Sequence, residues 1–228
     1  MLSIVTPIYD TLIVTKMNVE AVLGNTDVPF EFIVVYNHPP YEGVLDYLRG
    51  VEGLTILNFG ENIGCHEAVN QGFRVAKGDY LCKLDNDTIV PPGWASKMID
   101  ALEKVDGLAY VSADLDKDRQ PWKSRKEVIN GVELEIMEEG YVTFSCVVWP
   151  RRYWEELGPL TGFKRFYSGE ESKMYELAKS KGYLAAHLPS VVCKHLARTE
   201  YTDRLYGDWK LAYIGGKTDL PFERWMRR

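Results

Sequence analysis

Residues 80–88 read Tyr80-Leu-Cys-Lys-Leu-Asp-Asn-Asp-Thr88, a short apolar run that ends in two carboxylates separated by one residue. The run is typical of a buried strand. Because side chains alternate along an extended chain, Asp85 and Asp87 point to the same side if the extension continues. Ligands of open α/β sheets bind beyond the carboxyl ends of strands, so these acids are candidates for holding Mg²⁺ or Mn²⁺, which can bridge to a diphosphate. The alternative for an isolated Asp-x-Asp is a polar turn leaving a strand.

The first half of the chain alternates between strand-length and helix-length segments, which predicts an α/β fold with parallel strands joined by helices. The predicted strands cover residues 2–7, 31–36, 54–58, 80–84 and 108–112. Glycine and proline positions predict helices over residues 11–23, 65–76 and 92–105. The second half is less regular, with a predicted strand over 141–149, a helix over 170–181 and apolar runs over 183–188 and 191–193. No repeat or linker separates the halves, so we expect one domain over residues 1–228.

Composition excludes several classes of protein. The chain has 228 residues with a net charge of −6, which argues against an electrostatic footprint for nucleic acid. No apolar run approaches the roughly 18 residues of a spanning helix, and there is no basic leader, so we expect a cytoplasmic protein without a transmembrane segment. The four cysteines are scattered and predict neither a zinc site nor a redox motif. No Gly-x-Gly-x-x-Gly follows the first strand, which disfavours a dinucleotide oxidoreductase.

The stretch around the two carboxylates resembles the central block of family 2 glycosyltransferases of the GT-A fold. In that family an Asn-x-Gly loop enters a helix carrying Ala, Asn and Gly, and Ala-x-Gly-x-Tyr then leads into Leu-Asp-x-Asp. The matching residues here are Asn62, Gly64, Ala68, Asn70, Gly72, Ala76, Gly78, Tyr80, Leu84, Asp85 and Asp87. Residues 3–9, Ser-Ile-Val-Thr-Pro-Ile-Tyr, look like the family's first strand, and the resemblance continues to about residue 198.

The resemblance implies a GT-A fold, a single Rossmann-like mixed sheet flanked by helices. It also implies transfer of a sugar, with inversion, from a nucleotide-diphosphate sugar to the hydroxyl of a saccharide or another acceptor. Residues 1–112 would be the nucleotide-sugar-binding half, and residues 113–228 the acceptor-binding half and C-terminal tail. The donor-binding residues implied in this way are Thr6, Pro7, Tyr9, Tyr36, Asn37, Asn62, Gly64, Asn70, Asp85 and Asn86. Mn²⁺ or Mg²⁺ would be held by Asp85 and Asp87, with His195 returning late in the chain as a further ligand.

The resemblance also implies a general base. Ser168-Gly-Glu-Glu171 looks like the family's Glu-Asp motif at a helix start. Glu171 aligns with the general base and Glu170 with its neighbour, although the family has Asp at the second position, so either glutamate could act. We expect Glu171 to stay ionised at neutral pH, helped by the helix dipole. The alternative is that both acids merely favour the first turn of a helix.

Two departures from the family pattern bear on the donor. The second strand of the family ends Val-Val-Asp, whereas this chain has Val34-Val35-Tyr36, and a tyrosine cannot replace a carboxylate acceptor. A uridine preference is therefore not implied, and Tyr36 or Asn37 would recognise the base differently. The arginine that many relatives carry before the helix asparagine is Val69 here, so the charge of the diphosphate must be met by the metal and by Arg74, Lys83 or a loop lysine.

Two other functions compete with a glycosyltransferase. One is a non-catalytic nucleotide-sugar or carbohydrate-binding protein that kept the fold, which the retention of both acidic motifs disfavours. The other is a nucleotidyltransferase, which would need a triphosphate loop rich in glycine and basic residues after the first strand. Residues 7–12, Pro-Ile-Tyr-Asp-Thr-Leu, lack such a loop.

Overall fold

A computed structural model describes residues 1–117, 122–162, 169–197, 199–202 and 204–214. The strands are β1 (Leu2–Ile8), β2 (Phe30–Tyr36), β3 (Leu54–Asn58), β4 (Tyr80–Leu84), β5 (Thr88–Ile89), β6 (Leu108–Leu115), β7 (Ser124–Ile129), β8 (Val132–Met137), β9 (Cys146–Pro150) and β10 (Leu184–His195). The helices are α1 (Leu12–Asn25), α2 (Val44–Arg49), α3 (Cys65–Val75), α4 (Trp94–Lys104), α5 (Arg151–Leu157), α6 (Glu170–Ser180) and α7 (Arg204–Ile214).

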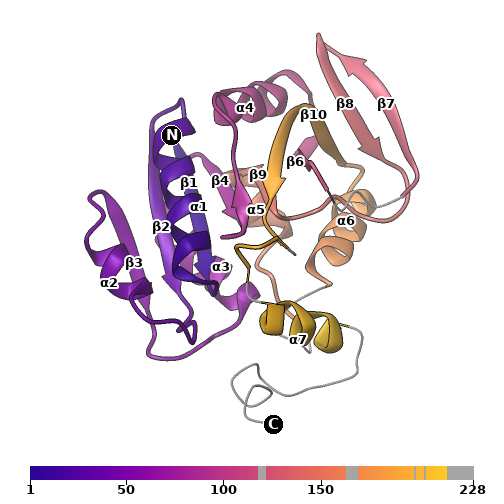
Figure 1. Ribbon diagram of the computed structural model, residues 1–228. Coiled ribbons are helices and arrows are strands. Elements are labelled where there is room, and N and C mark those ends of the chain that lie inside the picture. Colours follow the sequence, from indigo (N-terminus) through magenta and orange to yellow (C-terminus); the bar gives the residue numbers. More distant parts are fainter. Residues whose placement is uncertain (118–121, 163–168, 198, 203, 215–228) are drawn as a thin grey trace.

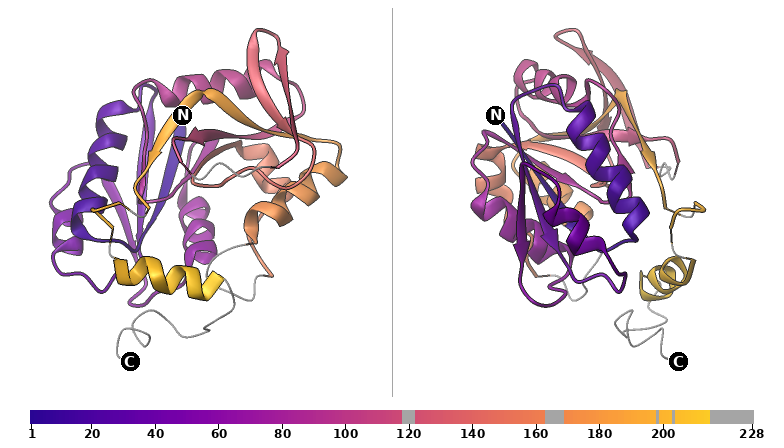
Figure 2. Two further views of the ribbon diagram at one scale, coloured as in Figure 1. Left: turned by 45° about the vertical axis from the view of Figure 1, so that its right-hand side comes forward. Right: turned by 60° about the vertical axis from the view of Figure 1, so that its left-hand side comes forward.

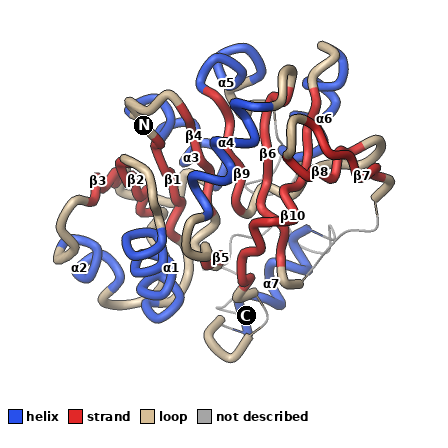
Figure 3. Tube along the Cα trace, turned by 90° about the horizontal axis from the view of Figure 1, so that it is seen from above, coloured by secondary structure: helices blue, strands red, loops and turns tan. Residues whose placement is uncertain are grey.

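One mixed sheet runs through the molecule in the order β3-β2-β1-β4-β9-β6-β10-β8-β7, with β5 paired to the end of β10 (Figures 1 and 3). Strands β1 to β4 are parallel neighbours. Strand β9 lies antiparallel between β4 and β6, and β10 is parallel to β6. The carboxyl ends of β1, β2 and β4 therefore meet at one edge, and α7 lies near this edge in the views of Figures 1 and 2.

Helices cover both faces of the sheet and bury two separate cores. On one face, side chains of α1, α2 and α4 pack with alternate residues of β1 and β2, including Ile4 and Val34. On the other face, α3, α5 and α6 pack with the intervening residues, including Val5 and Ile33. This alternation explains why β1 is buried along its whole length, as expected of a parallel strand covered on both sides. The predicted α/β class with a single mixed sheet is confirmed.

Most predicted elements of the first half are found with ends shifted by a few residues, but the second half differs more. The predicted strand over 141–149 is wrong at its start, because β9 begins at Cys146. The carbonyls of residues 143 to 145 accept hydrogen bonds from Ser112 Oγ, Lys83 Nζ and the Asp85 backbone instead of joining a ladder. The hairpin of β7 and β8 was not predicted. Its turn, Asn130-Gly131, has positive φ at both residues, which is the usual two-residue hairpin signal.

Helix α3 approaches β1 so closely that it leaves no room for a side chain at Gly72. A Cβ at this position would lie 2.3 Å from Val5 Cγ1, inside van der Waals contact. Both residues lie in the core on the α3 face of the sheet, and this helix follows directly on the Asn62–Gly64 loop. The contact thus fixes the distance between β1 and α3, the helix that follows the Asn62–Gly64 loop.

We predict that Gly72→Ala lowers the free energy of unfolding by about 1–3 kcal/mol, the usual cost of overpacking a core. Gly24→Ala is the matched control, because Gly24 also lies in a helix but has nothing within 4 Å of its Cβ position. The control should be neutral or slightly stabilising, since alanine is the better helix former. Urea denaturation of both variants measures the difference, and equal midpoints would contradict the close approach.

Candidate active site

The two carboxylates after β4 lie on a tight turn that is held from three directions. The backbone N–H of Asp85 donates to the carbonyl of Ser145 at 2.8 Å, and that of Thr88 donates to the carbonyl of Asp85 at 3.1 Å. The buried side chain of Asn18 in α1 donates to the carbonyls of Asp85 and Thr88, at 3.1 and 2.8 Å. Sequence reasoning missed Asn18, because its partners lie almost seventy residues away.

Asp85 is paired with a lysine from its own strand. Lys83 Nζ lies 2.7 Å from Asp85 Oδ1, and the Lys83 side chain is only 3% exposed, against 30% for Asp85. Nζ also donates to the carbonyl of Phe144 at 2.8 Å. Burial disfavours the Lys83 ammonium, but the charges of Asp85 and Glu170 and the hydrogen bond to Asp85 outweigh it and raise the pKa of this lysine. Lys83, predicted as a possible diphosphate contact, thus carries a buried charge that is neutralised within the protein.

Asp87 meets His195, as the sequence led us to expect. The end of β10 pairs antiparallel with β5, which places His195 opposite Thr88, and the N–H of Leu196 donates to the carbonyl of Asp87 at 2.7 Å. The imidazole Nε2 of His195 then lies 3.4 Å from Asp87 Oδ2. Burial opposes ionisation of Asp87, but the hydrogen bond with His195 and the charge of Lys210 lower its pKa. Burial disfavours the imidazolium of His195, yet Asp87 and Asp85 raise its pKa.

Asp85, Asp87 and His195 provide some of the ligands that a divalent cation needs, but not a full set. Across the described parts of the chain, no three His, Cys, Asp or Glu side chains are gathered closely enough to hold a metal ion by themselves. Asp87 and His195 nevertheless present a carboxylate and an imidazole side by side, and Asp85 lies two residues from Asp87. Mg²⁺ and Mn²⁺ sites in phosphate-handling proteins commonly have one or two carboxylates and take the remaining oxygens from the substrate, so this donor set fits such an ion.

The acidic pair lies at the start of α6, after Gly169 with φ of 93°. Glu170 Oε2 is 2.9 Å from His66 Nε2, and both side chains are buried. Burial opposes the Glu170 carboxylate, but His66 and the charge of Lys83 hold its pKa below the usual range. Sequence reasoning did not assign His66 to this site, since its partner is 104 residues away.

Glu171 behaves differently from its neighbour. Its burial, together with the negative charge of Glu170, raises the pKa of Glu171 to about 8. The expectation that Glu171 is ionised at neutral pH through the helix dipole is therefore wrong for the protein alone. Desolvation and an adjacent like charge exceed the modest effect of a helix terminus. Lys83 and Asp85 also influence this pKa, so the acidic pair and the end of β4 belong to one electrostatic cluster.

Several of the residues predicted to touch the nucleotide lie at the ends of β1 and β2 and in the Asn62–Gly64 loop. Asn37, 1% exposed, accepts from the N–H of Ile63 at 3.3 Å and donates to the carbonyl of Gly64 at 3.3 Å. Asn62 Oδ1 accepts from the N–H of Gly64 at 2.9 Å. Asn37 thus holds the Asn62–Gly64 loop against the end of β2, and Asn62 fixes the turn within the loop.

The remaining donor-side residues are mostly buried. The Tyr36 ring lies 4.8 Å from the ring of His38, whose Nε2 is 2.7 Å from Asn58 Oδ1.

Pro7 and Tyr9 are buried at the end of β1. Thr6 Oγ1 and Asn86 Nδ2 are buried without a hydrogen-bond partner among the described residues. Such polar atoms are candidates for a ligand or a water molecule.

Asn70 has a structural partner that the sequence did not suggest. Its Nδ2 donates to the carbonyl of Leu160 at 2.8 Å, and its Oδ1 accepts from the N–H of Leu160 at 2.9 Å. The side chain thus clamps the loop after α5 onto α3. Arg74, named as a possible partner of the diphosphate, is exposed near the end of α3 and donates to Gln71 at 2.9 Å.

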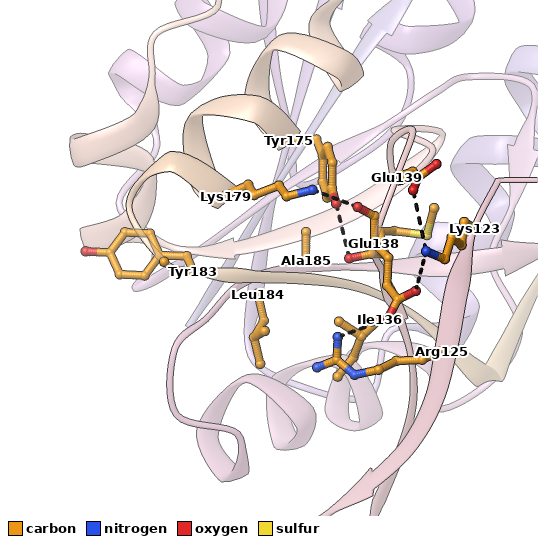
Figure 4. Close-up of a pocket in the computed structure, with 12 residues that line it drawn as sticks. Lys123, Arg125, Ile136, Glu138, Glu139, Tyr175, Lys179, Tyr183, Leu184 and Ala185 are labelled. Atoms are coloured by element: carbon orange, nitrogen blue, oxygen red, sulfur yellow. Dashed lines mark hydrogen bonds and ion pairs between the residues drawn. The ribbon is translucent and has the colours of Figure 1, made fainter.

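A separate groove of about 410 Å³ lies between β8, α6 and the start of β10 (Figure 4). Its cations are engaged: Lys123 lies 3.6 Å and Arg125 3.9 Å from carboxylate oxygens of Glu138, and Lys179 donates to the carbonyl of Glu138 at 2.7 Å. None of the predicted site residues lines this groove. It is therefore distinct from the cluster at the strand ends.

Comparisons with known proteins agree with this arrangement. Residues 3–167 match the family model described as Glycosyl transferase family 2. An uncharacterized glycosyltransferase of Rickettsia conorii is 30% identical over 169 residues, which cover 69% of this chain and 28% of that protein. One from Haemophilus influenzae is 27% identical over 111 residues, 49% of this chain and 37% of its own length. The chain thus spans about a third of these relatives.

Two solved structures share the fold. A crystal structure of GalNAc-T7 with UDP, GalNAc and Mn²⁺ superposes with a TM-score of 0.72 at 16% identity, covering 88% of this chain and 44% of that one. The mannosyltransferase PcManGT from Pyrobaculum calidifontis, in complex with GDP-Man and Mn²⁺, gives 0.64 at 17% identity, covering 88% and 58%. Both are glycosyltransferases of the GT-A fold.

The raised pKa of Glu171 predicts how stability depends on pH. Since its pKa rises from 4.5 to about 8 on folding, the folded state binds more protons between these values, and the free energy of unfolding falls as pH increases through this range. Glu171→Gln should flatten this decline, whereas Glu176→Gln, at an exposed position of the same helix, should not. Urea denaturation in EDTA at several pH values from 5 to 8 tests this, and parallel curves for Glu171→Gln and wild type would contradict it.

Proposed function

The chain belongs to glycosyl transferase family 2, and from that premise we propose that it transfers a sugar from a nucleotide-diphosphate donor to an acceptor hydroxyl with inversion. The observation that carries the proposal is the cluster at the end of β4. There the Asp-x-Asp turn, met by His195, shares one electrostatic environment with the acidic pair of α6, because Lys83 pairs with Asp85 and its charge also acts on both glutamates. A site for a diphosphate-bound cation beside a carboxylate of high pKa suits this reaction.

We propose that residues 1–112 bind the nucleotide sugar and that residues 113–228 contribute the acceptor side. Asp87 and His195, with Asp85 beside them, are the residues that would hold Mn²⁺ or Mg²⁺. A cation bound there would supply positive charge against the negative charge that develops on the departing diphosphate. The Asn62–Gly64 loop, held by Asn37, and the ends of β1 and β2 would enclose the nucleoside.

Glu171 is proposed as the general base. In the reaction the acceptor oxygen forms a bond to the anomeric carbon while the bond from that carbon to the diphosphate oxygen breaks. The acceptor proton passes to the Glu171 carboxylate, and the electron pair of the broken bond leaves with the diphosphate. With a pKa of about 8 the Glu171 carboxyl is mostly protonated at pH 7, so the fraction present as the carboxylate base, and with it the transfer rate, would rise as the pH increases toward 8. Glu170, engaged by His66, is the positioning partner whose charge helps to raise that pKa.

The end of β2 bears on which nucleotide base the sugar donor carries. Tyr36 replaces the carboxylate expected at the end of β2, and its ring packs beside His38, so base selection here does not use an Asp-to-uracil hydrogen bond. The neighbours of known structure were solved with UDP in one case and GDP-Man in the other. Thermal shifts with UDP-, GDP-, dTDP- and CMP-linked sugars, with and without Mn²⁺, identify the donor, because a ligand of the native state raises its stability.

The competing function is binding without catalysis. It shares the donor site and differs only in the fate of the donor, so hydrolysis of the stabilising nucleotide sugar in the presence of Mn²⁺ separates the two. A donor that stabilises the protein but is neither transferred nor hydrolysed would favour the binding protein.

Asp87→Asn should weaken Mn²⁺-dependent binding of the stabilising donor by more than about tenfold, because the variant removes a carboxylate from the cation site. Titration calorimetry with and without Mn²⁺ measures this effect. Asp100→Asn, at a half-exposed position of α4, is the control and should bind the donor as wild type does. An unchanged metal-dependent affinity in Asp87→Asn would remove Asp87 from the set of ligands.

Glu171→Gln should lower the transfer rate by about 10²- to 10⁴-fold while donor affinity stays near that of wild type. Glutamine keeps the shape of the side chain and removes its basicity. Glu170→Gln should act mainly on stability, since Glu170 is the buried partner of His66. If Glu170→Gln slows transfer more than Glu171→Gln does, the roles of the two residues are reversed. If neither slows it, the base lies elsewhere.

A further inference from the structure

Two aromatic side chains, Trp122 and Tyr141, meet at the edge of the proposed acceptor half. Trp122 precedes β7 and is 41% exposed, whereas Tyr141 follows β8 and is partly buried. Their ring centroids are 5.3 Å apart with an interplanar angle of 54°. Tyr141 packs against the core on the α3 face of the sheet, whereas Trp122 is among the exposed large hydrophobic side chains. We call this pair the aromatic platform.

The platform is built into the backbone around it. The N–H groups of Glu138 and Glu139 donate to the carbonyl of Lys123 at 3.0 and 3.1 Å, which fixes the chain next to Trp122. Gly140 has φ of 90°, and a Cβ there would lie 2.5 Å from Trp122 Cγ. The indole therefore lies directly against the backbone of Gly140. No other residue type at position 140 would leave room for it without displacing the ring.

The loop that carries Tyr141 connects the two reactive parts of the site. At its start, Tyr175 of α6 donates to the carbonyl of Met137 at 3.2 Å. At its end, the carbonyls of Phe144 and Ser145 accept from Lys83 Nζ and from the N–H of Asp85, both at 2.8 Å. Tyr141 thus lies on a segment that spans from the helix of Glu171 to the Asp-x-Asp turn.

The electrostatics of the tyrosine agree with this placement. Burial and the negative charge of Glu171 raise the pKa of Tyr141. The contribution of Glu171 applies when that carboxyl is ionised, and a side-chain hydrogen bond with Trp122 acts in the opposite direction on the same pKa. A half-exposed indole packed beside a tyrosine offers an apolar surface and a hydroxyl close together, a combination suited to amphipathic molecules.

We propose that Trp122 and Tyr141 form the acceptor subsite, and that its occupant is a pyranose ring whose apolar face stacks on Trp122. A sugar ring has C–H groups on one face and hydroxyls at its rim, so it matches an indole flanked by a phenol. This inference rests on the proposed function, because it supplies the acceptor of the same reaction.

The platform is tested by ¹⁹F NMR of the full chain labelled with 5-fluorotryptophan. The chain has six tryptophans, and the signal lost in Trp122→Phe assigns Trp122. The probes are the methyl glycosides of glucose, galactose, mannose and N-acetylglucosamine. We expect at least one of them to shift the Trp122 signal saturably while the signals of the buried tryptophans stay fixed. No saturable shift of Trp122 with any of the four overturns the proposal.

Gly140→Ala gives an independent check, because the added methyl group must push the indole aside. Binding of the glycoside should weaken by about tenfold, roughly the contribution of a good aromatic contact. Gly131→Ala is the matched control: it has φ of 80° in the turn of the same hairpin, but nothing lies within 4 Å of its Cβ position. The control should bind the glycoside as wild type does, and equal binding by Gly140→Ala would contradict the stacking.

Donor binding distinguishes failure of this inference from failure of the proposed function. If a nucleotide sugar with Mn²⁺ stabilises the protein but no glycoside reaches Trp122, the acceptor subsite is elsewhere and the transferase proposal stands. If no nucleotide sugar stabilises the protein, the proposed function itself fails.

Discussion

The buried ammonium of Lys83 is the group around which the site is organised. It lies in the middle of the sheet, is almost inaccessible to water, and bonds to both Asp85 and the carbonyl of Phe144. A buried charge is tolerated only when it is paired and hydrogen-bonded, so these contacts are obligatory. The same charge favours ionisation of Glu170. One side chain therefore links the Asp-x-Asp turn, the loop before β9 and the acidic pair.

Around this centre, contacts between distant parts of the sequence complete the arrangement. Strand β10 runs beside β6 and ends against β5, which brings His195 to Asp87. Strand β9 lies between β4 and β6, so the loop that leads into it crosses the carboxyl edge of the sheet. His66 of α3 reaches Glu170 of α6 on the same face of the sheet. The order of the strands thus brings the side chains of the site together, and each element contributes one or two of them.

This dependence on topology explains which features could be predicted from the sequence. Local patterns predict the strands of the first half, the Asp-x-Asp turn and the acidic start of α6, since each is encoded within a few residues. The raised pKa of Glu171 depends on burial and on a neighbouring charge, and the dipole argument alone gave the wrong sign. The role of Asn70 as a clamp of Leu160 depends on a loop ninety residues away. The β7–β8 hairpin was not predicted, although Asn130-Gly131 is a local signal for a two-residue hairpin turn.

The charged character of β7 has a consequence for association between molecules. Strand β7 is the last strand of the sheet, and its outer backbone groups are unpaired by any described strand, as expected of an edge. Such an edge is a template on which another chain can add a strand and begin to aggregate. Arg125, Lys126 and Glu127 are exposed along β7, and a chain that paired there would bring charges close together at a cost in solvation. The hairpin that supports the aromatic platform therefore also protects the sheet from uncontrolled growth at this edge.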